Sequence, residues 1–584
     1  MKRNTPRLSV LFSFLAVFIA GVFLFNCNCA CAQADVDSQR IERQTTEGEV
    51  IGVLHRATDT ISWKGIPYAK PPVGELRWKA PVPPEKRTAP LAATDFKEPG
   101  PHFIDHDMNP ATSRIIQGNE DCLYLNIWRP RNKAADLPVY IWIHGGGNSI
   151  QWPLISDTDL SMFANRTNMV VVSLNYRLGP LGFLSHPALK TGKKGDEKND
   201  SGNFALLDII QALTWLQSNI KSFGGDPGNV TISGESAGGE NVISLLASPL
   251  AAGLFHRAII QSGVIRPSPP EKGAQHAESV AARLLVKDGS APDEKAAVLK
   301  VKKMSRAELA AYLRSKSARE ILETYPEGMS RGMLLLPVTF QDGVVLPVNL
   351  YGAFRSGQYN KVPVLTGTNK EETKLFQTMD PRFTPWITDG SLFMDPAKTE
   401  LYELVAHYQS DGWKVMSVDN FARILRSNAD QPSVYAYQFL WGAGGVKNSV
   451  EPFPVSLLIG ASHTLEIDFV FGTEAVALGN LVFTRKNRPG RVALTNAIMD
   501  YWSSFARTGD PNRPDSGLPE WIPWSNIEGD PKCLLLDADF TKVKIDMSHE
   551  ELTNARIEEA LRAEPRFQEI RPFWESSIFK APVR

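Results

Sequence analysis

A serine between two glycines is the residue of this chain best placed to do chemistry. Ser236 lies in Gly234-Glu235-Ser236-Ala237-Gly238, after the β-branched run 229–233 and before a helix-forming stretch over 240–248. A turn this tight between strand and helix excludes side chains at the flanking positions and holds the serine strained, with its hydroxyl exposed. The start of the helix favours negative charge near the serine oxygen. The pattern predicts a nucleophile; the alternative is an ordinary glycine-rich turn.

A serine hydroxyl is a weak nucleophile at neutral pH, so it needs a base, and the base needs an orienting acid. Of the ten histidines, His463 has the most suitable setting, a polar turn of small residues before an apolar stretch. This setting indicates a loop at a strand's edge. Residues 363–367 are predicted to form a buried parallel strand, and α/β sheets place their chemistry where strands end. Glu371 and Glu372 follow it, and position alone allows either as the acid, or neither if they are a solvated charge pair.

A glycine run upstream can supply hydrogen-bond donors. His144-Gly145-Gly146-Gly147 follows a predicted strand that ends near residue 143. Glycines let backbone N–H groups approach a ligand closely. Together with the N–H of Ala237, this loop is expected to hold the oxyanion that forms when a serine attacks a carbonyl group.

Ordered motifs along nearly the whole chain make it resemble the type-B carboxylesterases, a family of α/β-hydrolases that includes cholinesterases and large fungal lipases. The motifs lie at residues 63–69, 71–78, 120–128, 175–179, 223–227, 255–263 and 502–512, besides the serine turn. The resemblance implies a central, mostly parallel, twisted sheet flanked by helices, with helical insertions that cap an active-site gorge. The site candidates span residues 144–463, which favours one catalytic domain over residues 35–584. Residues 272–327, rich in Ala, Leu, Lys and Glu with helical spacing, and residues 380–450 are expected to form helical insertions that cap the sheet.

The resemblance assigns roles to the candidate residues. The family's acid falls on Glu372, with Glu371 in the place of the preceding aspartate, and its histidine falls on His463. The implied oxyanion donors are Gly146, Gly147 and Ala237. The implied reaction is hydrolysis of a small to medium carboxylic ester through an acyl-enzyme, without cofactor or metal. The same triad can cleave amides, carbamates or thioesters. The family also has non-catalytic adhesion modules, which the intact triad argues against.

Residues around the serine are expected to shape its surroundings. Glu235 is expected to support the hydrogen bonds of the substrate pocket or to be a structural carboxylate. Asn148 replaces the family's usual aromatic residue, and either tunes the substrate or caps the following turn. Ser262 resembles a serine that lies near the acid. The resemblance implies structural ion pairs among Arg77, Glu120, Asp121 and Arg177.

Cys122 departs from the family pattern, in which this cysteine bridges one about thirty residues upstream. No cysteine lies between Cys31 and Cys122 in this chain. We therefore expect that the loop over about residues 95–120 is not held by a disulfide, and its gorge-lining residues cannot be transferred from the family.

The N-terminus carries an export pattern. Basic residues at 2, 3 and 7 precede an apolar run over 8–25, and Ala32-Gln33-Ala34 fits a cleavage site. Residues 1–34 are thus predicted to be a signal peptide, with a secreted or periplasmic product. The alternatives are an uncleaved anchor that leaves the catalytic domain outside the membrane, or lipid attachment at a cysteine of this segment.

Composition sets limits on the partners. The formal charge is −1 over 584 residues, and charges of both signs are mixed evenly. This argues against a nucleic-acid partner, and no nucleotide-binding fingerprint or metal-ligand cluster is evident. The residues His102, Asp105, His106 and Asp107 are expected to form a polar surface loop rather than a metal site. A small-molecule ester remains the expected partner, and the oligomeric state is open.

Overall fold

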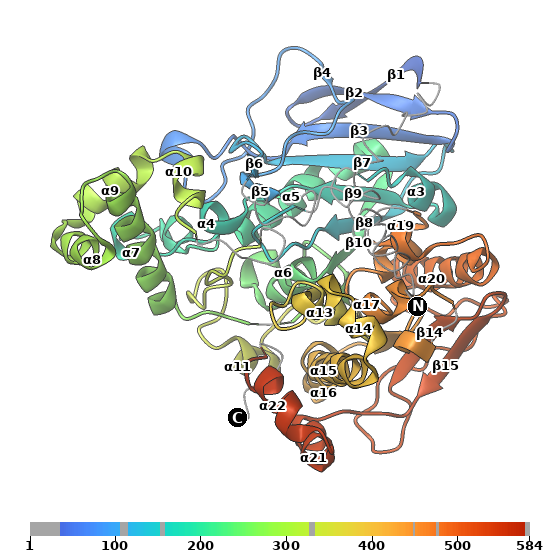
Figure 1. Cartoon of the computed structure of the whole chain (residues 1–584). Coiled ribbons are helices and arrows are strands. Elements are labelled where there is room, and N and C mark those ends of the chain that lie inside the picture. The colour runs from blue at the N-terminus through green and yellow to red at the C-terminus, as the bar shows by residue number, and fades with distance from the viewer. Residues whose placement is uncertain are drawn as a thin grey trace, which may run out of the picture.

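A central sheet organises the chain. The computed structural model describes residues 36–104, 115–151, 158–264, 266–325, 333–447, 450–474 and 478–577. The parallel strands are β8 (Leu137–Ile143), β9 (Val170–Leu174), β10 (Gly225–Glu235), β11 (Arg257–Gln261), β12 (Val364–Asn369), β13 (Val434–Phe439) and β14 (Cys533–Ala538). They lie in the order β9-β8-β10-β11-β12-β13-β14, which confirms the predicted parallel sheet. Figure 1 shows β9, β8 and β10 next to one another at its centre.

Antiparallel strands extend both edges of this sheet. One edge carries β1 (Val36–Thr45), β2 (Gly48–His55), β3 (Thr60–Pro67) and β7 (Tyr124–Pro130). The short β4 (Leu91–Ala92) pairs parallel to β2 on this edge. The other edge carries β15 (Val543–Ser548), paired with β14. A separate hairpin consists of β5 (His102–Ile104) and β6 (Ile115–Gln117). The described sheet is therefore mixed at its edges and parallel at its centre.

Side chains alternate between two cores, one on each face of the sheet. All seven residues of β8 are buried. Val139, Ile141 and Ile143 belong to one hydrophobic cluster, whereas Tyr140 and Trp142 belong to the other. This alternation is the period of two that a strand imposes, and burial on both faces explains the continuous apolar run in the sequence.

Helices cover both faces. The first core contains residues of α5 (Phe204–Asn219) and α6 (Ala237–Ala247). The second contains residues of α3 (Ser161–Thr167), α18 (Glu466–Phe471) and α20 (Arg488–Thr508). The smaller helices are α4 (Gly179–Gly182), α11 (Leu350–Arg355), α12 (Lys374–Gln377), α17 (Val455–Leu458), α19 (Gly479–Val482), α21 (Asn554–Ala563) and α22 (Phe567–Glu575).

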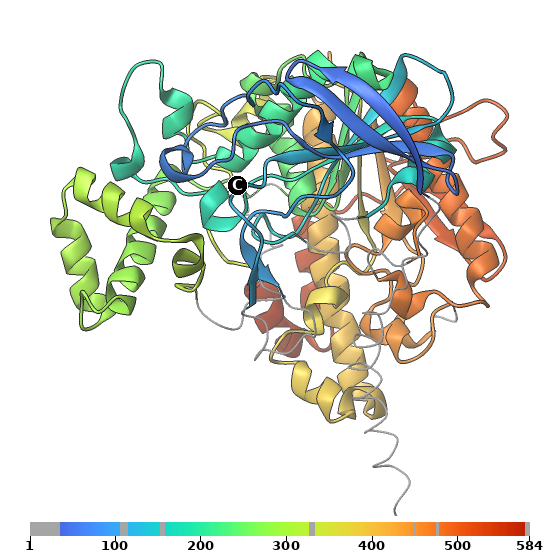
Figure 2. The same cartoon turned by 90° about the horizontal axis from the view of Figure 1, so that it is seen from above.

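The first expected insertion is helical. It contains α7 (Pro270–Lys287), α8 (Glu294–Lys303), α9 (Arg306–Ser315) and α10 (Ala318–Leu322). Figure 2 shows these four helices to one side of the sheet. Ser305 and Ser317 begin α9 and α10 with capping boxes, in which each serine and the glutamate three residues later satisfy one another's backbone N–H.

The prediction for residues 380–450 was wrong at one strand. This region does form α13 (Thr384–Thr388), α14 (Ser391–Met394), α15 (Pro396–Lys414), a π-helical turn (Val415–Asp419) and α16 (Asn420–Arg426). However, residues 434–439 form β13 of the central sheet, and all six are buried. Their valine, tyrosines and phenylalanine suit a strand that is covered on both faces.

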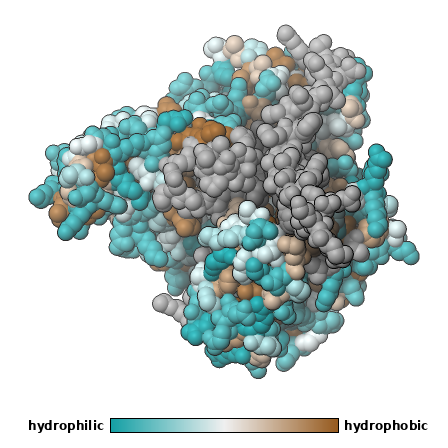
Figure 3. Space-filling model, in the orientation of Figure 1, coloured by the Kyte–Doolittle hydropathy of each residue, from teal (hydrophilic) through white to brown (hydrophobic). Residues whose placement is uncertain are grey.

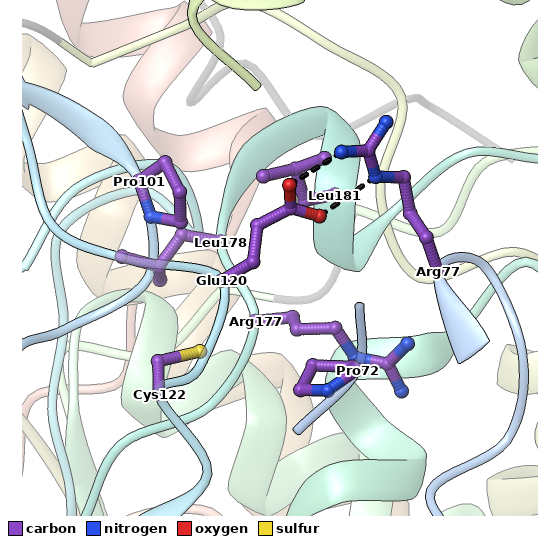
Figure 4. A pocket seen from close by; sticks show the side chains of 8 residues that line it. All are labelled: Pro72, Arg77, Pro101, Glu120, Cys122, Arg177, Leu178 and Leu181. Atoms are coloured by element: carbon purple, nitrogen blue, oxygen red, sulfur yellow. Dashed lines mark hydrogen bonds and ion pairs between the residues drawn. The ribbon is translucent and has the colours of Figure 1, made fainter. Parts of the chain in front are cut away.

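Cys122 is buried and unpaired, as expected from the sequence. It faces a small cavity that also borders Arg177 and the ion pair between Arg77 and Glu120 (Figure 4). Arg177 itself pairs with Asp208, at 2.7 Å between Nη2 and Oδ1. Burial raises the pKa of the Cys122 thiol, which keeps it protonated.

Gly100 lies where a bridging partner for Cys122 would fit. A Cβ built on Gly100 falls 3.6 Å from Cys122 Sγ. We predict that Gly100→Cys forms a disulfide with Cys122 and raises the free energy of unfolding by up to about 3 kcal/mol, because it closes a loop of about twenty residues. Denaturant unfolding with and without reductant measures this gain. Gly100→Ser is the matched control, and free thiols at both position 100 and position 122 in the oxidised variant would contradict the prediction.

The hydropathy of the described residues bears on membrane crossing and on the character of the surface. Among the described residues, no helix combines the length and the apolar character that membrane crossing requires. Outside its grey atoms, the face in Figure 3 is mainly hydrophilic with scattered hydrophobic patches. The predicted export segment, residues 1–34, lies outside the described residues.

Candidate active site

Ser236 occupies a strained turn between β10 and α6. Its backbone has φ 56° and ψ −123°, a conformation that L-residues rarely adopt. A Cβ on Gly238 would lie 2.0 Å from the carbonyl oxygen of Ile143, and one on Gly234 would lie 2.4 Å from the carbonyl carbon of Gly238. Both glycines are therefore required by close backbone contact, as the sequence predicted.

The turn exposes the serine selectively. Ser236 is partly exposed, whereas Glu235 and Ala237 on either side are buried. The Ser236 N–H donates to the carbonyl oxygen of Gln261 at 2.9 Å, which ties the turn to the end of β11. The hydroxyl thus sits at the carboxyl edge of the sheet, at the N-terminus of α6.

Glu372 holds the imidazole of His463. His463 Nδ1 lies 2.6 Å from Glu372 Oε2, and both side chains are buried. Glu372 Oε1 accepts three further hydrogen bonds, from Ser262 Oγ at 2.5 Å, Thr368 Oγ1 at 2.6 Å and the Asn369 N–H at 2.7 Å. This carboxylate is fixed on both oxygens. Ser262 therefore lies at the acid, where the resemblance placed it.

The other edge of the imidazole faces a second carboxylate. His463 Nε2 lies 3.2 Å from Glu235 Oε1. Between the described residues Ser236 and His463 the structure has no side-chain hydrogen bond, although the serine directly follows Glu235. Catalytic hydrogen bonds are often long without substrate and tighten when it binds. The structure thus joins His463 to both glutamates, and leaves the serine hydroxyl free to rotate.

A third buried glutamate completes the surroundings of the histidine. Glu466 accepts hydrogen bonds from Asn369 Nδ2 at 2.5 Å and Gln261 Nε2 at 3.2 Å. Burial, together with the charge of Glu372, raises the pKa of Glu466 to about 7. Burial also raises the pKa of Glu235 well above its ordinary value.

These carboxylates change the basicity of His463. Burial by itself lowers the pKa of an imidazole, but the negative charges of Glu235, Glu372 and Glu466 outweigh it and raise the pKa of His463 to about 9. The ring is also enclosed by aromatic side chains, with its centroid 4.7 Å from Trp413 and 5.3 Å from Phe376. Sequence reasoning missed Glu466, Trp413 and Phe376.

The glycine loop after β8 lies against the serine turn. A Cβ on Gly145 would lie 2.8 Å from the Glu235 carbonyl oxygen and 3.1 Å from Ser236 Cβ. Gly146 and Gly147 have φ of 105° and 61°, values that favour glycine. The loop therefore borders Ser236, with Ala237 on the other side as the first residue of α6.

Two side chains fix this loop from behind. The His144 ring stacks on Tyr176 at 4.4 Å, and burial lowers the pKa of His144 to about 4, which leaves it neutral at pH 7. Asn148 is buried with φ 54°, and its Oδ1 accepts from Asn241 Nδ2 at 2.8 Å. The Asn148 amide thus ties the loop to α6 and does not cap the following turn.

The prediction that His102 belongs to a polar surface loop was wrong: it is buried in β5, where its Nδ1 contacts the Gly100 carbonyl oxygen at 2.7 Å. Residues 105–107 lie outside the described part of the chain. Within the described ranges, no group of histidine, cysteine and acidic side chains is arranged to bind a metal ion.

Comparisons with known proteins agree with this geometry. A family model described as "Carboxylesterase family" matches residues 39–388 and 391–554. Para-nitrobenzyl esterase of Bacillus subtilis (strain 168) is 32% identical over 513 residues, which cover 85% of this chain and 95% of that protein. Carboxylesterase 1E of Rattus norvegicus is 33% identical over 542 residues, 83% of this chain and 88% of the relative. A solved structure of PNB esterase has a TM-score of 0.65 and 29% identity, covering 88% of this chain and 99% of its own.

Proposed function

The chain belongs to the carboxylesterase family and is a carboxylic ester hydrolase; from this premise we propose that Ser236, His463 and Glu372 form its catalytic triad. The observation that carries the proposal is the strained Ser236 directly after Glu235, whose carboxylate lies 3.2 Å from the imidazole that Glu372 holds at 2.6 Å. The proposed substrate is a small to medium ester.

The proposed reaction proceeds in two steps. Ser236 Oγ attacks the ester carbonyl carbon while His463 Nε2 takes its proton, and Glu372 stabilises the imidazolium through Nδ1–H. The N–H groups of Gly146, Gly147 and Ala237 stabilise the oxyanion. The C–O bond to the alcohol breaks, and His463 returns the proton to the departing alcohol oxygen. A water molecule, deprotonated by His463, then attacks the acyl carbonyl carbon; the bond from that carbon to Ser236 Oγ breaks, His463 returns the proton to Oγ, and the acid is released.

Competing substrates can be tested directly. We expect 4-nitrophenyl acetate to give a burst followed by steady turnover, and matched esters to react faster than the corresponding amides, carbamates and thioesters. A panel that varies acyl and alcohol size then defines the pocket, including the effects of Glu235 and Asn148. Absence of both burst and turnover in the purified chain would favour the adhesion-module alternative.

The pH dependence of the reaction follows from the carboxylates around His463. Only neutral imidazole accepts the serine proton, and a raised pKa keeps the ring protonated to higher pH. We therefore predict that kcat/KM rises with pH through an apparent pKa above 6.5, the ordinary value for histidine. Initial rates with phenyl acetate between pH 6 and 10 measure this pKa, and a profile that is already flat at pH 6.5 would contradict the prediction.

Export through residues 1–34 is a further part of the proposal. The basic residues, apolar run and small-residue cleavage pattern support a signal peptide. Mass spectrometry of the mature protein distinguishes cleavage near Ala34 from retention of the segment as an anchor.

A further inference from the structure

Glu371, directly before the proposed catalytic acid, binds the loop that carries His463. Its backbone N–H donates to the Ala461 carbonyl oxygen at 2.9 Å. Its side-chain Oε2 accepts from the Ala461 N–H at 3.1 Å. Glu371 thus holds both backbone groups of a residue that lies two positions before His463.

The same carboxylate reaches a second loop and a buried cation. Glu371 Oε1 accepts from the Gly444 N–H at 3.2 Å and pairs with Lys374 Nζ at 2.9 Å. The Lys374 side chain is completely buried, and the Glu371 side chain is 15% exposed. Hydrogen bonds to a charged acceptor are stronger than neutral ones, so this carboxylate is a firm anchor for both loops.

Gly460 shows how closely the loop is seated on this carboxylate. Its φ is 51°, and a Cβ there would lie 2.0 Å from Glu371 Oε2 and 3.1 Å from Lys374 Nζ. A larger residue there would force either the Glu371 carboxylate or the loop to shift. The close approach at Gly460 and the two hydrogen bonds at Ala461 therefore define one position of the loop.

Neighbouring contacts continue this pairing up to the histidine itself. Asn369 Nδ2 donates to the Ser462 carbonyl oxygen at 2.7 Å, and the His463 N–H donates to the Glu372 carbonyl oxygen at 3.2 Å. Residues 461, 462 and 463 are therefore each hydrogen-bonded to one residue of the 369–372 segment, namely Glu371, Asn369 and Glu372.

We propose that Glu371 is a positioning residue for His463: its carboxylate holds the 460–463 loop so that Nδ1 of the imidazole meets Glu372 and Nε2 faces the serine turn at Glu235. The proposal rests on the proposed function only in the role it gives His463. The two adjacent glutamates then have separate roles: Glu372 orients the imidazole ring, and Glu371 positions the backbone of the loop that carries it.

A nearby buried acid does not replace Glu371. Glu451 is also buried close to this cluster, where a Cβ on Gly442 would lie 2.4 Å from its Oε1. Burial and the charge of Glu371 raise the pKa of Glu451 well above its ordinary value, which favours its neutral form. Glu371 is therefore the counter-charge of Lys374.

The test compares two ways of breaking the same ion pair. Glu371→Gln removes the charge and one of the acceptor oxygens, whereas Lys374→Met leaves both acceptors for Ala461 and Gly444. We expect Glu371→Gln to lower kcat about ten- to a hundredfold, with KM within about twofold, because a small displacement of His463 slows both acylation and deacylation. We expect Lys374→Met to lower kcat less than about threefold, although it costs stability.

A second measurement does not depend on turnover. The Nδ1 proton of His463, bonded to Glu372, should give a downfield signal in histidine-labelled protein. This signal should persist in Lys374→Met. It should also persist in Glu120→Gln, a control variant that loses an ion pair far from His463. In Glu371→Gln the signal should shift or broaden. Equal losses of kcat in Glu371→Gln and Lys374→Met, or an unchanged signal in Glu371→Gln, would overturn the proposal. Absence of turnover in the unmutated chain would instead refute the proposed function.

Discussion

Replacing Ser236 with alanine should abolish ester turnover, with kcat/KM reduced on the order of 10⁴- to 10⁶-fold. Alanine removes the oxygen that forms the acyl-enzyme and leaves only transition-state stabilisation by the loop N–H groups. The backbone strain at this position, φ 56°, stays the same or is relieved, so the fold should be retained. Hydrolysis of 4-nitrophenyl acetate, together with circular dichroism, separates loss of chemistry from loss of structure.

Covalent labelling provides the matched control for this variant. An organophosphate should label the unmutated chain once, at Ser236, and should not label Ser236→Ala. Ser244→Ala removes another serine, buried within α6, and should keep both labelling and turnover. Labelling that persists in Ser236→Ala would show that another residue is the nucleophile.

Replacing Glu372 with glutamine should lower kcat/KM by about 10⁴-fold, because the substitution reverses the polarity of one hydrogen bond. Glu372 Oε1 accepts a hydrogen bond from the backbone N–H of Asn369, a group that can only donate. The glutamine carbonyl oxygen therefore takes that site, and its NH₂ group faces His463 Nδ1. The imidazole must then accept at Nδ1 and carry its proton on Nε2, where it cannot act as a base.

Glu371→Gln is the natural comparison for this variant, since the two residues are adjacent and both are buried or nearly so. The loss in Glu372→Gln should exceed the loss in Glu371→Gln by at least tenfold. Kinetics at saturating and limiting substrate, with thermal unfolding as the check on folding, provide the comparison. Similar losses in both variants would mean that Glu372 only supports the loop.

Local patterns in the sequence predicted those parts of the site that depend on neighbours along the chain. The strand, tight turn and helix around Ser236 require glycines at fixed positions, so their spacing is visible in the sequence. The choice of Glu372 over Glu371 needed the family resemblance, because both follow the same strand and only the packed structure turns one toward His463.

Contacts between distant segments could not be predicted in this way. Trp413 packs on His463 from helix α15, and Glu466 is held by side chains of β11 and β12. Neither residue stands in a pattern that indicates its neighbour. Strand β13 was hidden for a related reason: its buried residues 434–439 follow a long helical region, and only pairing with β12 and β14 makes them a strand.

The contact between β8 and the serine turn makes two functional parts move as one. The Ile143 carbonyl oxygen lies where a Cβ on Gly238 would be, and Gly145 rests against Ser236. The proposed nucleophile and the proposed oxyanion donors are thus in close contact through backbone atoms. When the sheet deforms, the Ser236 oxygen and the proposed N–H donors should shift together, so the distance between them should stay the same. Substitutions elsewhere in the chain can then change the shape of the gorge without changing the relative positions of these groups.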